Sequence, residues 1–177
     1  MSMSCEECYI PDIYKKPILV FGCGNILFGD DGFGPEVISY LEKNYKIPKN
    51  VCVMNVGTSI RDILFTLILG EQKPKKIIIV DAVDKGKEAG EIFEISLEEI
   101  SDVKIDDFSI HMIPSSNLLK ELRDFCNVEV IILACQVEKI PKQVEPGLSK
   151  SVKLAIPKMC KEILKRLNLN LTSTGYS

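Results

Sequence analysis

The sequence predicts an α/β fold in the form of a three-layer sandwich, with a mostly parallel, twisted sheet of about five strands and helices on both faces. Apolar strand-like runs alternate with helical patterns along the chain, which is typical of a parallel sheet between two helix layers. With 177 residues and 46% hydrophobic content, the chain can fill one core but not two. We therefore expect a flexible tail over residues 1–16, a single α/β domain over 17–170 and a loose tail over 171–177.

In the first half, the unbroken apolar run 18–21 predicts a strand that is covered on both faces. Pro35 is placed to open a helix that continues to about Tyr45. A second strand is expected over 51–56, followed by an apolar helical pattern from Ile60 that Gly70 is placed to stop. The third strand, 77–80, runs directly into Asp81.

In the second half, alternating residues at 90–95 predict an edge strand, and a short helical turn follows at 97–100. Residues 101–109 are polar and are expected to form a loop. A helix with apolar residues from Leu118 to Phe125 on one face then leads to a strand over 128–134 and a loop over 135–149. The last predicted helix covers 151–167 and contains Pro157, which should kink it unless the helix begins there.

Composition excludes several classes of partner. A net charge of −3 with interspersed lysine and glutamate gives neither a basic stripe for nucleic acid nor a polybasic membrane patch. The N-terminus has no basic and apolar signal-peptide regions, and no apolar run reaches membrane-spanning length, so we expect a cytoplasmic protein. Most of the seven cysteines lie in apolar segments and are expected to be small buried residues, while Cys5 and Cys8 fall in the polar tail.

A glycine-rich segment over residues 22–36 joins the first strand to the first helix and contains five of the eleven glycines. Such a density of glycine favours positive φ angles or a close approach of another group. Two adjacent carboxylates, Asp30 and Asp31, lie in its middle. Since consecutive side chains of a loop diverge, we expect one of them to face a cleft and the other to hold the loop.

A dinucleotide site is one alternative for this segment, but the residues disfavour it. Leu27 stands where the third glycine of a Gly-x-Gly-x-x-Gly motif belongs, and the two acids would repel phosphate. Asn55 also occupies the place of the ribose-binding acid at the end of the second strand, which argues against a nucleotide-dependent oxidoreductase. A purely structural turn and a site for metal binding or proton transfer remain open.

Three polar residues are expected at one edge of the sheet: Asp31 after the first strand, Asp81 after the third, and His111, the one histidine of the chain. The carboxyl ends of parallel strands meet at the same edge, so the two acids should lie close together. Two carboxylates and one imidazole would make an open metal site suited to zinc or nickel. Each residue alone also has a structural explanation, such as turn formation or a hydrogen-bonded core histidine.

The glycine-rich motif Gly22-x-Gly24-Asn25-x-Leu27-x-x-Asp30-Asp31-Gly32-x-Gly34, together with Asp81-Ala82 and His111, resembles the nickel-iron hydrogenase maturation endopeptidases. The resemblance covers residues 17–165 and includes Gly57-Thr58 and Gly147-Leu148-Ser149. Within that family, the chain looks most similar to the delta-type accessory protein of deazaflavin-reducing hydrogenases.

This resemblance implies a protease that removes the C-terminal extension of a hydrogenase large-subunit precursor after nickel insertion. It implies that Asp31, Asp81 and His111 contact nickel supplied by the substrate, with no tightly held metal of the protein's own. Either a carboxylate, Asp31 or Asp81, acts as general base in an aspartic-type reaction, or the metal activates water. A non-catalytic nickel-binding assembly chaperone is the alternative function.

Two positions depart from the family pattern. Some members carry glutamate at the first acidic position, where this chain has the shorter Asp31. Cys135-Gln136 stands where relatives commonly have Gly-Val, which alters the expected rim of the site.

Overall fold

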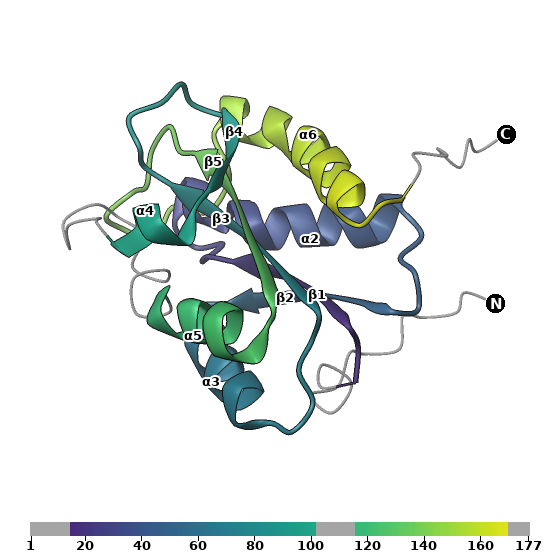
Figure 1. Ribbon diagram of the computed structural model, residues 1–177. Coiled ribbons are helices and arrows are strands. Elements are labelled where there is room, and N and C mark those ends of the chain that lie inside the picture. Colours follow the sequence, from purple (N-terminus) through teal and green to yellow (C-terminus); the bar gives the residue numbers. More distant parts are fainter. Residues whose placement is uncertain (1–14, 102–115, 170–177) are drawn as a thin grey trace, which may run out of the picture.

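The computed structural model describes residues 15–101 and 116–169, and these residues are organised around a five-stranded sheet with the strand order β2-β1-β3-β5-β4 (Figure 1). The strands are β1 (Ile18–Cys23), β2 (Val51–Gly57), β3 (Lys76–Val83), β4 (Ile92–Ile95) and β5 (Glu129–Gln136). β1, β2, β3 and β5 run parallel, and β4 pairs antiparallel with β5 at one edge. The predicted five-stranded, mostly parallel sheet is confirmed.

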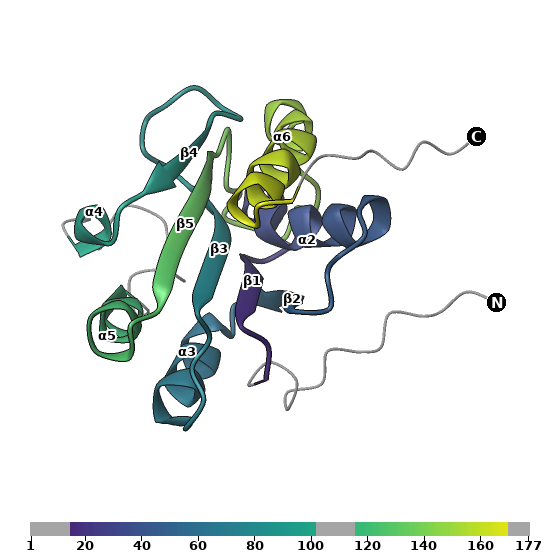
Figure 2. The same ribbon diagram turned by 45° about the vertical axis from the view of Figure 1, so that its right-hand side comes forward.

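Helices cover both faces of the sheet (Figures 1 and 2). One face carries α2 (Phe33–Asn44) and α6 (Lys150–Arg166), which pack against each other. The other carries α3 (Ile60–Leu69) and α5 (Ser116–Cys126), with the short α4 (Leu97–Ser101) beside α5. This arrangement confirms the three-layer α/β sandwich.

Side chains of the central strands alternate between two cores because successive residues of a strand point to opposite faces. Val20, Ile78 and Leu133 belong to the cluster under α2 and α6. Their neighbours Leu19, Ile77 and Ile132 belong to the cluster under α3 and α5. The middle of each central strand is therefore apolar on both faces, as the unbroken runs in the sequence predicted.

Three strands extend further than their apolar runs predicted: β1 to Cys23, β3 to Val83 and β5 to Gln136. The parallel ladder between β3 and β5 continues through the pairs Asp81↔Ala134 and Val83↔Gln136, since backbone pairing does not require apolar side chains. The expectation that Asp81 follows the third strand is therefore wrong, because Asp81 lies within its last three residues.

One helix boundary differs from expectation, and the structure decides the open alternative for another helix. α2 begins at Phe33, so Pro35 lies in the first turn of the helix, where its missing N–H has no intrahelical partner to lose. α6 begins at Lys150 and continues through Pro157, so it does not start at the proline. Over the ranges 15–101 and 116–169, none of the helices combines the length and the apolar content needed to cross a bilayer.

Candidate functional site

The glycine-rich turn brings the start of α2 into direct contact with the ends of β1 and β3. A Cβ at Gly34 would lie 2.2 Å from the carbonyl oxygen of Cys23 and 2.6 Å from that of Val80, so only glycine fits there. Gly24 has a φ of +124°, and a Cβ at this position would lie 1.9 Å from the carbonyl oxygen of Asp31. Because neither glycine has a side chain, the turn that carries both acids, η1 (Gly29–Gly32), can pack closely against the carboxyl edge of the sheet.

Asp30 is the acid that holds the loop. Its carboxylate is 1% exposed and accepts four hydrogen bonds from residues of the β5–α6 loop. The donors are the backbone N–H groups of Glu138 (2.8 Å), Lys139 (2.9 Å) and Ser149 (2.6 Å), and the Ser149 hydroxyl (3.0 Å). A buried carboxylate is tolerated when its oxygens are satisfied in this way. Asp30 therefore ties the first loop of the site to the last.

Asp31 lies beside it but is only partly buried. Its Oδ2 accepts a hydrogen bond from the backbone N–H of Asn25 at 2.9 Å, and the same N–H lies 3.1 Å from the Asp31 carbonyl oxygen. Asn25 in turn accepts the N–H of Leu27 through its side-chain oxygen at 3.0 Å. Asp30 is thus the acid that holds the loop, as was expected of one of the two, and Asp31 lies nearer the surface; that Asp31 faces a cleft is still a prediction.

Asp81 is 1% exposed and accepts the backbone N–H of Ala82 through Oδ1 at 2.8 Å. The alternation along β3 directs its side chain toward the face covered by α3 and α5, on the side where Cys23 lies. Burial raises the pKa of the Cys23 thiol well above its ordinary value, and the Asp81 and Asp31 carboxylates raise it further. The geometry agrees: Gly22 pairs with Val80, so Cys23 and Asp81 follow paired residues on neighbouring strands, and a Cβ at Gly24, next to Cys23, would lie 3.7 Å from Asp31 Oδ1.

The third predicted ligand, His111, lies outside the described residues, so its expected place at the same edge of the sheet as the two acids stays a prediction. Among the residues that are described, no three His, Cys, Asp or Glu side chains form a group that could hold a metal ion. Asp31 and Asp81 place two carboxylates at the same edge of the sheet, and any further ligand to a shared ion would have to come from elsewhere in the chain or from a bound partner.

Gln136, at the end of β5, holds the loop that follows β3 through side-chain hydrogen bonds. The sequence indicated this residue only as a departure from the family pattern. Its side-chain oxygen accepts the backbone N–H groups of Lys85 (2.8 Å) and Lys87 (3.1 Å). Its side-chain nitrogen donates to Asp84 Oδ1 (2.9 Å) and to the Val137 carbonyl (3.1 Å). Two donors and two acceptors exhaust the hydrogen-bonding capacity of an amide side chain. Gln136, itself 3% exposed, therefore fixes the β3–β4 loop against the end of β5.

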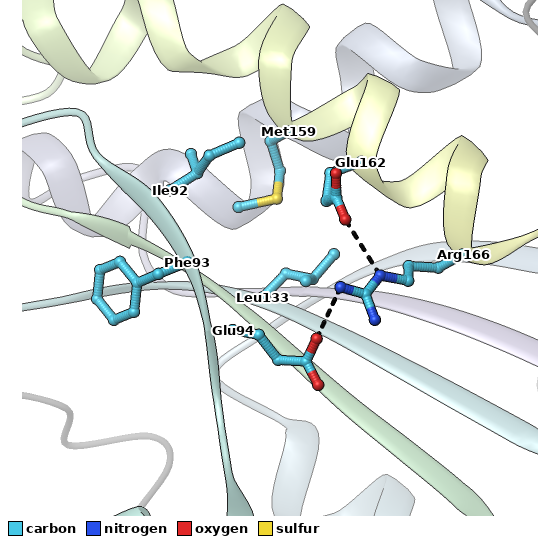
Figure 3. A pocket seen from close by; sticks show the side chains of 7 residues that line it. All are labelled: Ile92, Phe93, Glu94, Leu133, Met159, Glu162 and Arg166. Carbon is cyan, nitrogen blue, oxygen red and sulfur yellow. Dashed lines mark hydrogen bonds and ion pairs between the residues drawn. The ribbon is translucent and has the colours of Figure 1, made fainter.

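A pocket of about 160 Å³ lies between α6 and the strands β4 and β5 (Figure 3). Ile92, Leu133 and Met159 supply apolar lining, and the Arg166 guanidinium, which also lines the pocket, pairs with Glu94 (2.8 Å) and Glu162 (3.1 Å). The Arg166 carbonyl accepts a hydrogen bond from the side chain of Lys76, the first residue of β3. This end of the pocket therefore lies where the parallel strands begin, whereas Asp31 lies where they end. Leu133 and Met159 belong to the core under α2 and α6, whereas Asp81 points to the opposite face of the sheet, so the pocket is also separate from Asp81.

Comparison with known proteins identifies relatives over most of the chain. A family model described as "Hydrogenase maturation protease" matches residues 35–166. A protein of Methanocaldococcus jannaschii whose name places it among the hydrogenase maturation proteases is 42% identical over 85% of this chain and 96% of its own length. The coenzyme F420 hydrogenase subunit delta of Methanothermobacter thermautotrophicus is 37% identical over 89% of this chain and 98% of its own length.

Solved structures share the architecture. The hydrogenase maturating endopeptidase HybD from Escherichia coli superposes with a TM-score of 0.71 over 85% of this chain and 91% of that protein, at 24% identity. At this level of identity, the likeness supports the fold alone. The parallel sheet and its helix layers are thus shared with a known endopeptidase structure.

Proposed function

Since the chain belongs to the hydrogenase maturation protease family, we propose that it is an endopeptidase that removes the C-terminal extension of a nickel-iron hydrogenase large-subunit precursor after nickel insertion. The resemblance predicted from the glycine-rich motif is confirmed, including the likeness to a delta-type accessory protein. Two relatives support a maturation protease, because they are 42% and 37% identical to this chain and are matched over almost their whole length.

The observation that carries the proposal is that Asp31 and Asp81 lie at the same carboxyl edge of the sheet, Asp31 in the turn after β1 and Asp81 near the end of the neighbouring strand β3. Open α/β sheets bind their ligands at this edge. One acid lies on a tight glycine turn and the other near the end of a central strand, so both stand on rigid elements. That rigidity suits a reaction in which a peptide bond must be held in a defined orientation.

Two mechanisms use these groups. In the first, Asp31 or Asp81 accepts a proton from water, which then attacks the scissile carbonyl. In the second, nickel already bound to the substrate gains oxygen ligands from the two acids, and the chain's contribution is to bind and orient the nickel-bearing segment. We propose that His111 completes the second arrangement as a nitrogen ligand.

The nickel ion belongs to the substrate in this proposal. Two carboxylates and one histidine would form an open set of three ligands, which should hold a first-row metal less tightly than a closed four-ligand site. We expect the purified protein to be largely metal-free and its reaction to depend on whether the precursor carries nickel.

The experiment presents one large-subunit precursor, with and without nickel, to the metal-stripped protein and follows the precursor's mass. Cleavage of the nickel-loaded form alone supports the proposal. Equal cleavage of both forms would reject recognition of substrate nickel and indicate an ordinary protease. Tight binding of the precursor without cleavage would instead support the non-catalytic assembly chaperone. His111→Ala should behave like Asp31→Asn if the histidine belongs to the same site.

A further inference from the structure

The loop that carries Asp31 also carries an exposed apolar surface. Gly29 N donates to the Glu145 carbonyl at 2.9 Å and Glu145 N donates to the Leu27 carbonyl at 2.9 Å, so Phe28 and Glu145 form a short parallel bridge. Leu27 and Val144 each directly precede one residue of this bridge, so the two residues lie next to each other along the chain segments that the bridge joins. Together with Ile26, they form what we call the apolar rim.

The three residues of the apolar rim are exposed, at 53% for Ile26, 44% for Leu27 and 64% for Val144. Single exposed apolar side chains are ordinary, but an apolar group beside a candidate site is a feature of recognition surfaces. The other large apolar side chains exposed in the described ranges lie on helices: Phe65, Leu69, Phe125 and Leu154. The apolar rim is thus the part of this exposed apolar surface that lies beside the turn of Asp31, to which Asn25 connects it.

The apolar rim is held rigidly, which distinguishes it from a loose loop. Both of its segments are fixed by Asp30, whose carboxylate binds residues 138, 139 and 149 while its own backbone lies in η1. The backbone N–H of Leu27 donates a hydrogen bond to the Asn25 side chain, and the backbone N–H of Asn25 donates one to the Asp31 carboxylate. The rim and the Asp31 carboxylate are therefore parts of one unit, and binding there needs little ordering of the protein.

Lys139 and Glu145, two of the charged residues near the rim, pair with each other at 3.2 Å, so their charges offset each other. The exposed Lys142 and the partly buried Asp31 lie on the same two segments and carry opposite charges. We propose that the apolar rim binds an extended apolar segment of the protein substrate that flanks the scissile bond. This inference rests on the proposed function, because a peptide bond placed at Asp31 and Asp81 requires its flanking chain to cross this edge.

The test uses the nickel-loaded precursor with the full-length protein and measures both its dissociation constant and the kinetics of its cleavage. Leu27→Ser and Val144→Ser should each raise KM and the dissociation constant about tenfold and leave kcat unchanged, since loss of an apolar contact that is equal in the ground and transition states affects binding alone. Leu27→Met should restore wild-type values. Leu154→Ser, which changes an equally exposed residue on α6, is the matched control and should behave as wild type.

The outcomes separate this inference from the proposed function. If the wild-type protein binds but does not cleave the precursor, and both serine variants weaken binding, the apolar rim stands while the protease assignment falls. If both variants bind the precursor as tightly as wild type, or lose kcat with an unchanged KM, the inference is overturned. Circular dichroism confirms that each variant is folded.

Discussion

Replacement of Asp30 by alanine should destabilise the protein strongly although it removes no apolar group. The change leaves three backbone N–H groups and the Ser149 hydroxyl without their buried acceptor. Hydrogen bonds to a charged group contribute about 1.5–3 kcal/mol each, and water that enters the vacated space recovers part of the loss. We expect the free energy of unfolding to fall by about 4 kcal/mol, a large share of the roughly 5–15 kcal/mol typical of a domain.

Thermal unfolding followed by circular dichroism measures this effect. A loss of about 4 kcal/mol corresponds to a drop of about 10 °C in Tm for a domain of this size. Ser149→Ala removes only the hydroxyl bond and should cost about 1 kcal/mol, while Glu121→Ala, an exposed carboxylate on α5, should change stability by less than about 0.5 kcal/mol. An Asp30→Ala protein that unfolds within about 1 kcal/mol of wild type would refute the view that this carboxylate joins the two loops.

Three further predictions follow from the same geometry. Asp31→Asn and Asp81→Asn should each lower kcat/KM for precursor cleavage at least about 100-fold while the fold persists, and unfolding well below the parent temperature would show that these acids are structural instead. Gln136→Leu should speed hydrogen exchange of the backbone amides in the β3–β4 loop, because two of them lose their acceptor; unchanged exchange would contradict the assigned contacts. Burial raises the pKa of the Cys160 thiol from its ordinary value near 9.0 to about 12. The folded state therefore holds this proton more tightly than the unfolded state does. As a result, the free energy of unfolding should be constant with respect to this group below pH 9 and should fall between pH 9 and 12. Accordingly, iodoacetamide at pH 8.5 should modify the half-buried Cys126 far faster than Cys160, as peptide mass mapping can show.

The sequence by itself determined the fold class and the order of the elements. Apolar residues that repeat with a period of two or of 3.6 report which faces are buried, and this information is local. The strand runs at 18–21 and 77–80 and the helical pattern after Ile60 were predicted on that basis and are confirmed. The sequence also predicted that Asp31 and Asp81 lie at the same edge of the sheet, because parallel strands bring their carboxyl ends to one edge.

Only the tertiary structure decided which of the two adjacent acids is buried. The partners of Asp30 lie 108, 109 and 119 residues further along the chain, and no local pattern indicates that they meet it. Asp81 was expected after its strand but lies within it, because the partner strand β5 extends the ladder to Gln136. The contact between Leu27 and Glu145 likewise depends on the order of the strands. Periodicity identifies elements that bury apolar area, whereas hydrogen-bond partners distant in sequence are determined by how those elements pack together.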